Sequence, residues 1–387
     1  MKRLSETFSV FVFVILMLVA CGSTEGSHPG YHPGIGMDTG TGTGTGTGIA
    51  ITNLMGGAIQ KQLTLTGSVT TFAGGAGISG STDGTGTAAR FYHPYVITTD
   101  GINLYVGVNQ TIRKIALATG VVTTLAGSAG VTTHPSGSVS DGTGTAARFY
   151  GLQGITTDGT NLYVVDGEYT IRKVIIATGV VTTLAGAAYP DTPAGSTDGT
   201  GAAARFYNPQ GITTDGTNLY VVDSGNSTIR KVVIATGVVT TLAGSVGVVG
   251  SVDGTGPAAQ FNYPTGITTD GMNLYVTDRH IIRKVVIATG VVTTLTDGAG
   301  IVAWFDYPYG ITMDGTNLYV TDHYIHAIRK VAIATGVVTM IAGSAGMIGS
   351  SDGTGIAAQF NYPAGITTDG LNLYVADSLN HTIRKIQ

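Results

Sequence analysis

The sequence predicts an all-β fold, a six-bladed β-propeller built from four-stranded antiparallel blades. The first observation is a repeat, because one isoleucine recurs with spacings of 58, 57, 55, 44 and 55 residues, at Ile97, Ile155, Ile212, Ile267, Ile311 and Ile366. The second is that each repeat holds four short runs rich in Val, Ile, Thr and Tyr, with no helical spacing. The third is that partial repeats stand at the two ends of the chain. A period of this size is typical of repeat architectures.

One complete repeat shows the four expected strands, here called a to d. They are residues 266–269, 273–277, 282–287 and 291–295. Asp270-Gly271 suits a tight hairpin between a and b, because Gly accepts positive φ and Asp bonds its own backbone. A sheet that is apolar on both sides must be covered by neighbours. Radial stacking around an axis covers both sides and leaves only short outer edges.

The number of blades follows from strand c, which contains Ile-Arg-Lys six times, with arginines at Arg113, Arg172, Arg230, Arg283, Arg329 and Arg384. The last copy stops at Ile386-Gln387 and has no strand d behind it. Residues 63–74 instead read as a strand d with no strands a to c before it. We therefore expect the N-terminal strand, Val69 to Ala73, to complete the C-terminal blade and close the ring.

The chain divides into three parts, residues 1–20, 21–60 and 61–387. Lys2 and Arg3 precede an apolar run at 8–20, which is short for a membrane span. The run ends at Cys21, the sole cysteine, and resembles a bacterial lipoprotein signal. That resemblance implies a lipid anchor on Cys21 and a place in the cell envelope, at the outer membrane of a Gram-negative organism because Gly22 follows. The alternative is an ordinary secretory signal with a chance cysteine.

Composition supports the other two parts. Residues 21–60 are dominated by Gly, Thr, Ser and Pro, which predicts a flexible linker. One cysteine permits no intramolecular disulfide. The net charge is −4 and the sequence shows no basic patch, so we expect no nucleic-acid partner.

A second phrase, of the type Asp-Gly-Thr-Gly-Thr-Ala-Ala-Arg-Phe, lies in the crossings from strand d of one blade to strand a of the next. It begins at Asp83, Asp141, Asp198, Asp253 and Asp352, and in a shortened crossing at Asp297. We interpret it as a turn followed by one helical turn in the Ala-Ala-Arg/Gln-Phe run, with the Phe filling a gap between blades. A calcium or phosphate loop is the alternative, but a second acidic residue is missing nearby.

The repeated phrase Tyr-Pro-x-Gly-Ile-Thr-x-Asp-Gly-x-Asn-Leu-Tyr-Val-x-Asp, followed by Ile-Arg-Lys, resembles the NHL-repeat family across residues 61–387. The resemblance implies a six-bladed propeller of a kind that mostly binds proteins, RNA or glycans, with a minority of metal-dependent lyases. Blade one departs from the pattern. We place its Gly107 where the other repeats have an acid, at Asp166, Asp223, Asp278, Asp322 and Asp377.

These five strand-b acids have two interpretations. They are either a cation-binding ring at the channel mouth, or local structure, each making an Asx turn and an ion pair with the Arg of Ile-Arg-Lys. We favour local structure. A second series belongs to the a-to-b hairpins and predicts turn chemistry, at Asp100, Asp158, Asp215, Asp270, Asp314 and Asp369.

Chain direction reverses at every strand, so the d-to-a crossings and b-to-c turns open on one face. That face holds the residues that differ between blades. They are Tyr95, Gln153, Gln210, Thr265, Tyr309 and Ala364 before strand a, and Glu168, Tyr169, Arg279, His280, His323, Tyr324, His326 and His381 in the b-to-c turns. We expect them to line a funnel around the axis that suits a sugar or a peptide. Unconstrained drift of exposed loops is the alternative.

The sequence thus predicts a lipid-anchored binding or scaffold module, monomeric and without cofactor, that recognises an envelope protein, peptide or glycan. No nucleophile elbow or phosphate-binding loop demands catalysis. The alternative is a metal-assisted hydrolase or lyase using His280, His323 or His326 with neighbouring acids. A third reading is adhesion or spacing by recently copied repeats.

Overall fold

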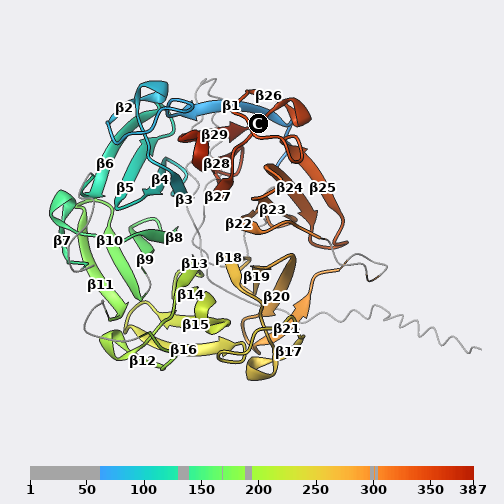
Figure 1. The fold of residues 1–387 in the computed structure, drawn as a ribbon. Coiled ribbons are helices and arrows are strands. Elements are labelled where there is room, and N and C mark those ends of the chain that lie inside the picture. Colours follow the sequence, from blue (N-terminus) through green and yellow to red (C-terminus); the bar gives the residue numbers. More distant parts are fainter. Residues whose placement is uncertain (1–61, 130–138, 168, 188–193, 297–299, 301–303) are drawn as a thin grey trace, which may run out of the picture. The chain divides into compact units, whose positions relative to one another are not determined.

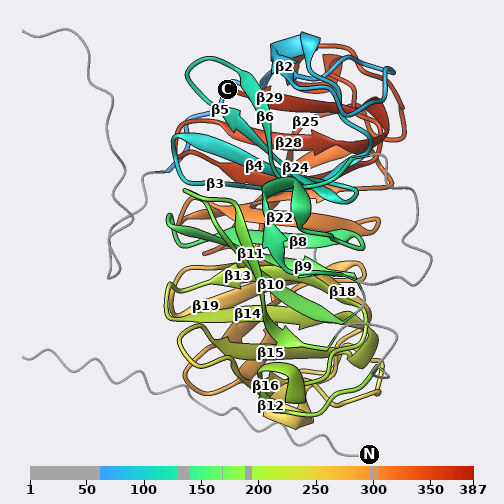
Figure 2. The same cartoon turned by 90° about the vertical axis from the view of Figure 1, so that its left-hand side faces the viewer.

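The computed structural model describes residues 62–129, 139–167, 169–187, 194–296, 300 and 304–387. The predicted signal, the lipid site at Cys21 and the linker lie outside the described residues. Within residues 62–387, six blades surround an axis, as Figure 1 shows from above and Figure 2 from the side. Among the described residues, no helix is long and apolar enough to cross a membrane.

Strand a is innermost in every blade, and strand b follows it through the Asp-Gly hairpin. The a strands are β3 (Pro94–Thr99), β8 (Leu152–Thr157), β13 (Pro209–Thr214), β18 (Pro264–Thr269), β22 (Pro308–Met313) and β27 (Pro363–Thr368). The b strands are β4 (Asn103–Val108), β9 (Asn161–Asp166), β14 (Asn218–Asp223), β19 (Asn273–Asp278), β23 (Asn317–Asp322) and β28 (Leu373–Asp377).

Strands c and d complete the predicted antiparallel sheet. The c strands are β5 (Thr111–Ala116), β10 (Thr170–Ile175), β15 (Thr228–Val233), β20 (Ile281–Val286), β24 (Ala327–Ala332) and β29 (Thr382–Ile386). The d strands are β6 (Val121–Gly127), β11 (Val180–Gly186), β16 (Val238–Ala243), β21 (Val291–Thr294), β25 (Val338–Ala342) and β1 (Ser68–Ala73).

The structure corrects the prediction of four strands, because five blades have a fifth, outer strand. It is the Gly-Thr of the Asp-Gly-Thr-Gly phrase and pairs with strand d, as β2 (Gly84–Thr85), β7 (Gly142–Thr143), β12 (Gly199–Thr200), β17 (Gly254–Thr255) and β26 (Gly353–Thr354). A 3-10 turn follows each, but it begins two residues before the expected Ala-Ala-Arg/Gln-Phe run and includes only the first Ala of that run. These turns are η1 (Gly86–Ala88), η2 (Gly144–Ala146), η3 (Gly201–Ala203), η5 (Gly256–Ala258) and η6 (Gly355–Ala357). Two more lie in b-to-c turns, η4 (Ser224–Asn226) and η7 (Ser378–Asn380).

Ring closure by the N-terminal strand is confirmed. β1 lies between β26 and β29 in the last blade, with Val69 opposite Ile386 and Thr71 opposite Arg384. Figure 1 shows this blue strand beside the red C-terminal strands. Ahead of β1, the backbone N–H of Leu63 donates to Asp314 Oδ2 in the a-to-b hairpin of blade 5, at 3.0 Å. The chain therefore enters the ring on the side of the a-to-b hairpins.

The hydrophobic core consists of six clusters, each shared by two neighbouring blades. Because side chains alternate along a strand, Leu104 and Val106 pack toward blade 6, whereas Tyr105 between them packs toward blade 2. The Phe of each crossing is buried in these clusters, as expected, and Phe91 is fully buried between blades 6 and 1. Both sides of every sheet are thereby covered.

Blade 1 lacks the strand-b acid at Val108, not at Gly107 as expected. Val108 pairs with Pro94 as Asp223 pairs with Pro209, so Val108 and not Gly107 occupies the position of the acids. Gly107 instead accommodates Val96, which stands where the other blades have Gly. A Cβ added to Gly107 would lie 2.5 Å from Val96 Cγ2. In the other blades the glycine of this pair is on strand a and the larger residue is on strand b. In blade 1 the larger residue, Val96, is on strand a and Gly107 is on strand b.

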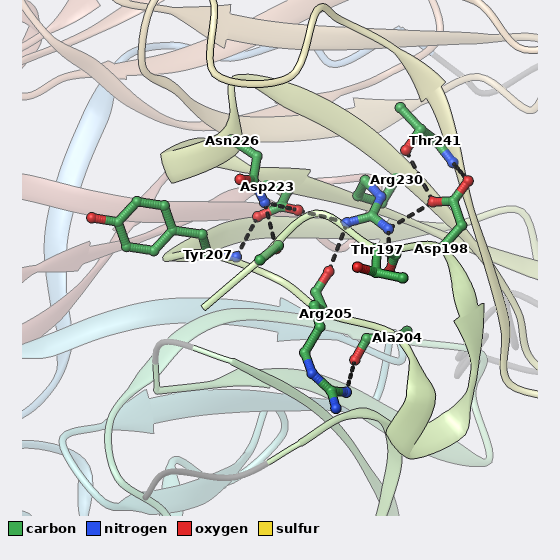
Figure 3. Close-up of polar contacts among 10 residues, drawn as sticks. Thr197, Asp198, Ala204, Arg205, Tyr207, Asp223, Asn226, Arg230 and Thr241 are labelled. Atoms are coloured by element: carbon green, nitrogen blue, oxygen red, sulfur yellow. Dashed lines mark hydrogen bonds and ion pairs between the residues drawn. The ribbon is translucent and has the colours of Figure 1, made fainter. Parts of the chain in front are cut away.

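An arginine of strand c is the polar centre of each blade, and Figure 3 shows the one in blade 3. Arg230 is fully buried; its Nη1 donates to Asp223 Oδ2 at 2.7 Å and its Nη2 to Asp198 Oδ1 at 2.7 Å. Its guanidinium also lies 5.1 Å from the Phe206 ring centre. Asp223 Oδ1 accepts the backbone N–H of Tyr207 in the preceding crossing and closes no Asx turn. The predicted ion pair is confirmed, and the arginine ties strand b, strand c and the crossing together.

The second acid series builds the a-to-b hairpins, as predicted. Asp215 Oδ1 accepts the backbone N–H groups of Thr217 and Asn218, and Oδ2 accepts the Tyr220 hydroxyl at 2.8 Å. Burial together with the bond to Asp215 raises the pKa of Tyr220 above its ordinary value of 10. The equivalent tyrosines have raised pKa values for the same two reasons, namely Tyr105, Tyr163, Tyr275, Tyr319 and Tyr374.

The buried pair predicts an asymmetric response to charge removal. We expect Asp223→Asn to lower the free energy of unfolding by about 3–5 kcal/mol, because Arg230 keeps its charge in a dry site without its buried counter-ion. The matched change Asp198→Asn removes a carboxylate that is 48% exposed, and we expect a loss of about 1 kcal/mol or less. Urea unfolding measures both, and equal losses would contradict the proposed role of Asp223.

The hairpin tyrosines predict a loss of stability at alkaline pH. Above pH 10 the unfolded chain releases phenolic protons that the folded chain retains, so the free energy of unfolding falls as pH rises. Each such tyrosine contributes a slope of about 1.4 kcal/mol per pH unit. We expect Tyr220→Phe to make the slope shallower by that amount in urea titrations between about pH 10 and 12. An unchanged slope would show that Tyr220 titrates alike in both states.

Candidate functional site

The propeller has two different faces. The b-to-c turns and d-to-a crossings share one, here called the crossing face, where for example Gly225 N–H donates to Tyr207 O at 2.9 Å and Gly77 N–H to Asn380 O at 3.1 Å. The a-to-b and c-to-d turns form the other, here called the hairpin face. As predicted, the residues that differ between blades lie toward the crossing face.

The strand-b acids form no open ring on this face. The five are buried, and each ion-pairs with the arginine of its own blade, at 2.7–3.0 Å. Burial raises the pKa of Asp166 and Asp377 to about 6 despite the adjacent arginines. The carboxylate oxygens are occupied by arginine and backbone donors, so they are not free to bind a cation.

The axis is closed and forms no open funnel. Tyr95 and Tyr309 come from blades 1 and 5 and pack with ring centres 4.8 Å apart, while the Tyr309 hydroxyl donates to Gln210 Oε1 of blade 3 at 3.0 Å. Tyr309 is only 7% exposed, and burial raises the pKa of both phenols. Gln153 and Thr265 line the cavity on the axis, whose volume is about 70 Å³. Ligand pockets usually measure about 300–1,000 Å³, so this cavity is too small for a sugar or a peptide.

An aromatic cluster extends from this closed axis over blades 5 and 6. Tyr309 contacts His323, with ring centres 5.8 Å apart, and His323 contacts both Tyr324 and Tyr362, at 5.4 and 5.1 Å. Tyr307 packs on Tyr324 at 5.1 Å. The His323 Nδ1 lies 2.9 Å from Pro363 O, and burial lowers the pKa of the ring. Tyr324 is nevertheless 48% exposed, so the cluster presents apolar surface to solvent.

Every blade also contains a tyrosine of the repeat that was not predicted as a site residue. It follows the buried Phe by one or two residues, and the six are Tyr92, Tyr150, Tyr207, Tyr263, Tyr307 and Tyr362. Five of them are more than a third exposed. Tyr263, Tyr307 and Tyr362 have positive φ and precede proline, as do His93 and Asn208 in blades 1 and 3. This backbone conformation is therefore part of the repeat, whereas a tyrosine at this position is confined to blades 4 to 6.

The remaining candidates occupy the b-to-c turns. Arg279 and His280 form the two-residue turn of blade 4, where Arg279 has a φ of 55°. Tyr169 lies immediately before β10, and Glu168 lies outside the described residues. His326 Nδ1 accepts the backbone N–H of Tyr362 at 3.1 Å. In the described part of the chain, no three His, Cys, Asp or Glu side chains are placed to hold a metal ion.

Comparisons with known proteins support the fold. The NHL repeat model matches residues 360–386, which confirms the expected resemblance for the last repeat. A protein of unknown function from Bacteroides thetaiotaomicron VPI-5482 is similar in structure, with TM-score 0.60, 22% identity, and 82% of this chain and 75% of that chain covered. An auxiliary nutrient binding protein from the same strain has TM-score 0.59, 18% identity and coverages of 82% and 76%. A phosphatase, described as putative, from B. thetaiotaomicron VPI-5482 has TM-score 0.53, 16% identity and coverages of 83% and 78%. No curated protein matches.

Proposed function

We propose that this propeller is a binding module of the cell envelope, and that a protein, peptide or glycan docks on its crossing face. The observation that carries the proposal is the exposed aromatic cluster on blades 5 and 6. Tyr307 and Tyr324 keep substantial exposed area, while His323 packs between Tyr324 and the buried Tyr309 and also contacts Tyr362. Aromatic residues of this kind dominate binding energy at recognition surfaces. A structural neighbour described as a nutrient binding protein supports this choice.

The other candidate functions have weaker support. His280 and His323 each place Nδ1 about 3 Å from a backbone carbonyl, Phe305 O and Pro363 O, so each has one ring nitrogen committed locally. The metal-assisted hydrolase or lyase would need three converging ligands, which the described residues do not supply. Simple spacing by copied repeats would not require aromatic residues concentrated on two blades.

The binding proposal predicts that substitutions on the crossing face weaken binding and that substitutions on the hairpin face do not. We expect full-length protein to capture a partner from envelope extract or a glycan array, and Tyr324→Ala to weaken that binding about tenfold or more. The control change Leu371→Ala removes an even more exposed apolar side chain, 67% against 48%, from an a-to-b hairpin and should leave binding intact. Binding that survives Tyr324→Ala would move the site away from the aromatic cluster.

The anchoring proposal rests on the motif at Cys21 and has its own test. We expect cells grown with labelled palmitate to transfer the label to the protein, and Cys21→Ser to abolish labelling and release the chain from the membrane fraction. Stable anchoring requires more than one lipid chain, so partial acylation would leave a detectable soluble pool. A Cys21→Ser variant that stays in the membrane fraction would contradict a lipid anchor.

A further inference from the structure

The crossing between blades 4 and 5 is shorter than the others and carries the one tryptophan of the chain. Ile267 and Ile311 are 44 residues apart, against 55 to 58 elsewhere. In other blades the residue before the buried Phe is Arg or Gln. In blades 1, 3, 4 and 6 its side chain lies against a glycine of the same crossing, as Gln260 lies against Gly250. In blade 5 this residue is Trp304, and it is 67% exposed. An exposed indole at this position sets the blade 4–5 junction apart.

Trp304 lies on a fixed support. Its ring stacks on His280 with ring centres 4.4 Å apart and an interplanar angle of 15°. His280 Nδ1 lies 3.0 Å from Phe305 O, and because a carbonyl only accepts, Nδ1 carries the proton. His280 Nε2 is then the acceptor of the Arg279 Nε–H bond, at 3.2 Å. With both nitrogens bonded, the imidazole holds one face of the indole while the other faces solvent.

Hydrogen-bonding groups border this aromatic platform. Arg279 has five N–H groups and uses one for His280 and one for Asn262 Oδ1, at 3.4 Å. Asn262 is partly exposed and supplies a further amide donor, and Tyr263 beside it is exposed. The exposed Asp306 stands two residues beyond Trp304 and carries the opposite charge to Arg279. The surface therefore pairs one flat apolar face with several directional polar groups.

We propose that this junction, formed by Trp304, His280, Arg279 and Asn262, binds a neutral oligosaccharide; the proposal rests on the crossing face being the binding face. A pyranose ring has an apolar face of C–H groups that covers an indole, and an edge of hydroxyls that pairs with amide and guanidinium groups. A phosphate or sulfate ligand would call for clustered cations, whereas these four residues include one arginine and no lysine. A largely apolar peptide would call for an enclosing pocket, and the platform is open.

The single tryptophan makes the test specific. Because the chain contains one Trp, all tryptophan fluorescence reports on this site. We expect a panel of neutral gluco-, manno-, xylo- and galacto-oligosaccharides to contain a member that changes the emission saturably and protects Trp304 from acrylamide quenching. By calorimetry, Trp304→Ala should weaken that binding about tenfold or more, and Trp304→Phe less. Tyr150→Ala removes a similarly exposed ring from blade 2 and should have no effect.

The outcomes separate this inference from the proposed function. A saccharide that binds by calorimetry without changing Trp304 emission, and with equal affinity for Trp304→Ala, would overturn the site while the binding function stands. Failure of every neutral saccharide, with a protein partner still lost on Tyr324→Ala, would overturn the ligand class alone. Unchanged thermal unfolding of Trp304→Ala is expected from its exposure and shows that any loss of binding is local.

Discussion

An arginine buried between two carboxylates and a phenylalanine ring is the interaction on which each regular blade depends. Arg230 joins Asp223 at the end of strand b to Asp198 at the start of the outer strand, and it covers Phe206 between blades. Burying such charges is expensive, and a buried pair is weak evidence for stability. Its consequence here is positional, because one guanidinium sets where the crossing lies relative to strands b and c. The crossing face is therefore built on a repeated charged centre.

Most of the fold was predictable because it repeats. Six copies of Ile-Arg-Lys and a displaced strand d were enough for blade number and ring closure, and Asp–Arg pairing followed from residue type. The fifth strand was missed because two residues, Gly and Thr, carry no periodicity. Blade 1 was misaligned by one residue at Gly107. Counting without gaps from Asn-Leu-Tyr-Val already puts Val108 at the position of the acid, and strand pairing confirms it.

The sequence predicted that the variable residues lie toward the crossing face, but it did not predict how their side chains pack. Tyr95 and Tyr309 were expected to line a funnel, and they instead pack against each other and shut the axis. The side chains that meet at the axis come from three blades. Their packing depends on the distances between blades, which the sequence of a single repeat does not show. Trp304 was read as part of a shortened crossing. Its exposure of 67% could not be predicted from the repeat, because the other crossings have Arg or Gln at this position.

The bond between Leu63 and Asp314 has a consequence for how the molecule is displayed. It holds the start of the ring at an a-to-b hairpin, and Gln387 accepts the backbone N–H of Thr66 close by. Both ends of the described propeller thus lie on one side, and the aromatic surface lies on the opposite side. A tether or label attached at Leu63 would therefore join the propeller on the side away from Tyr324 and Trp304, and would not cover them.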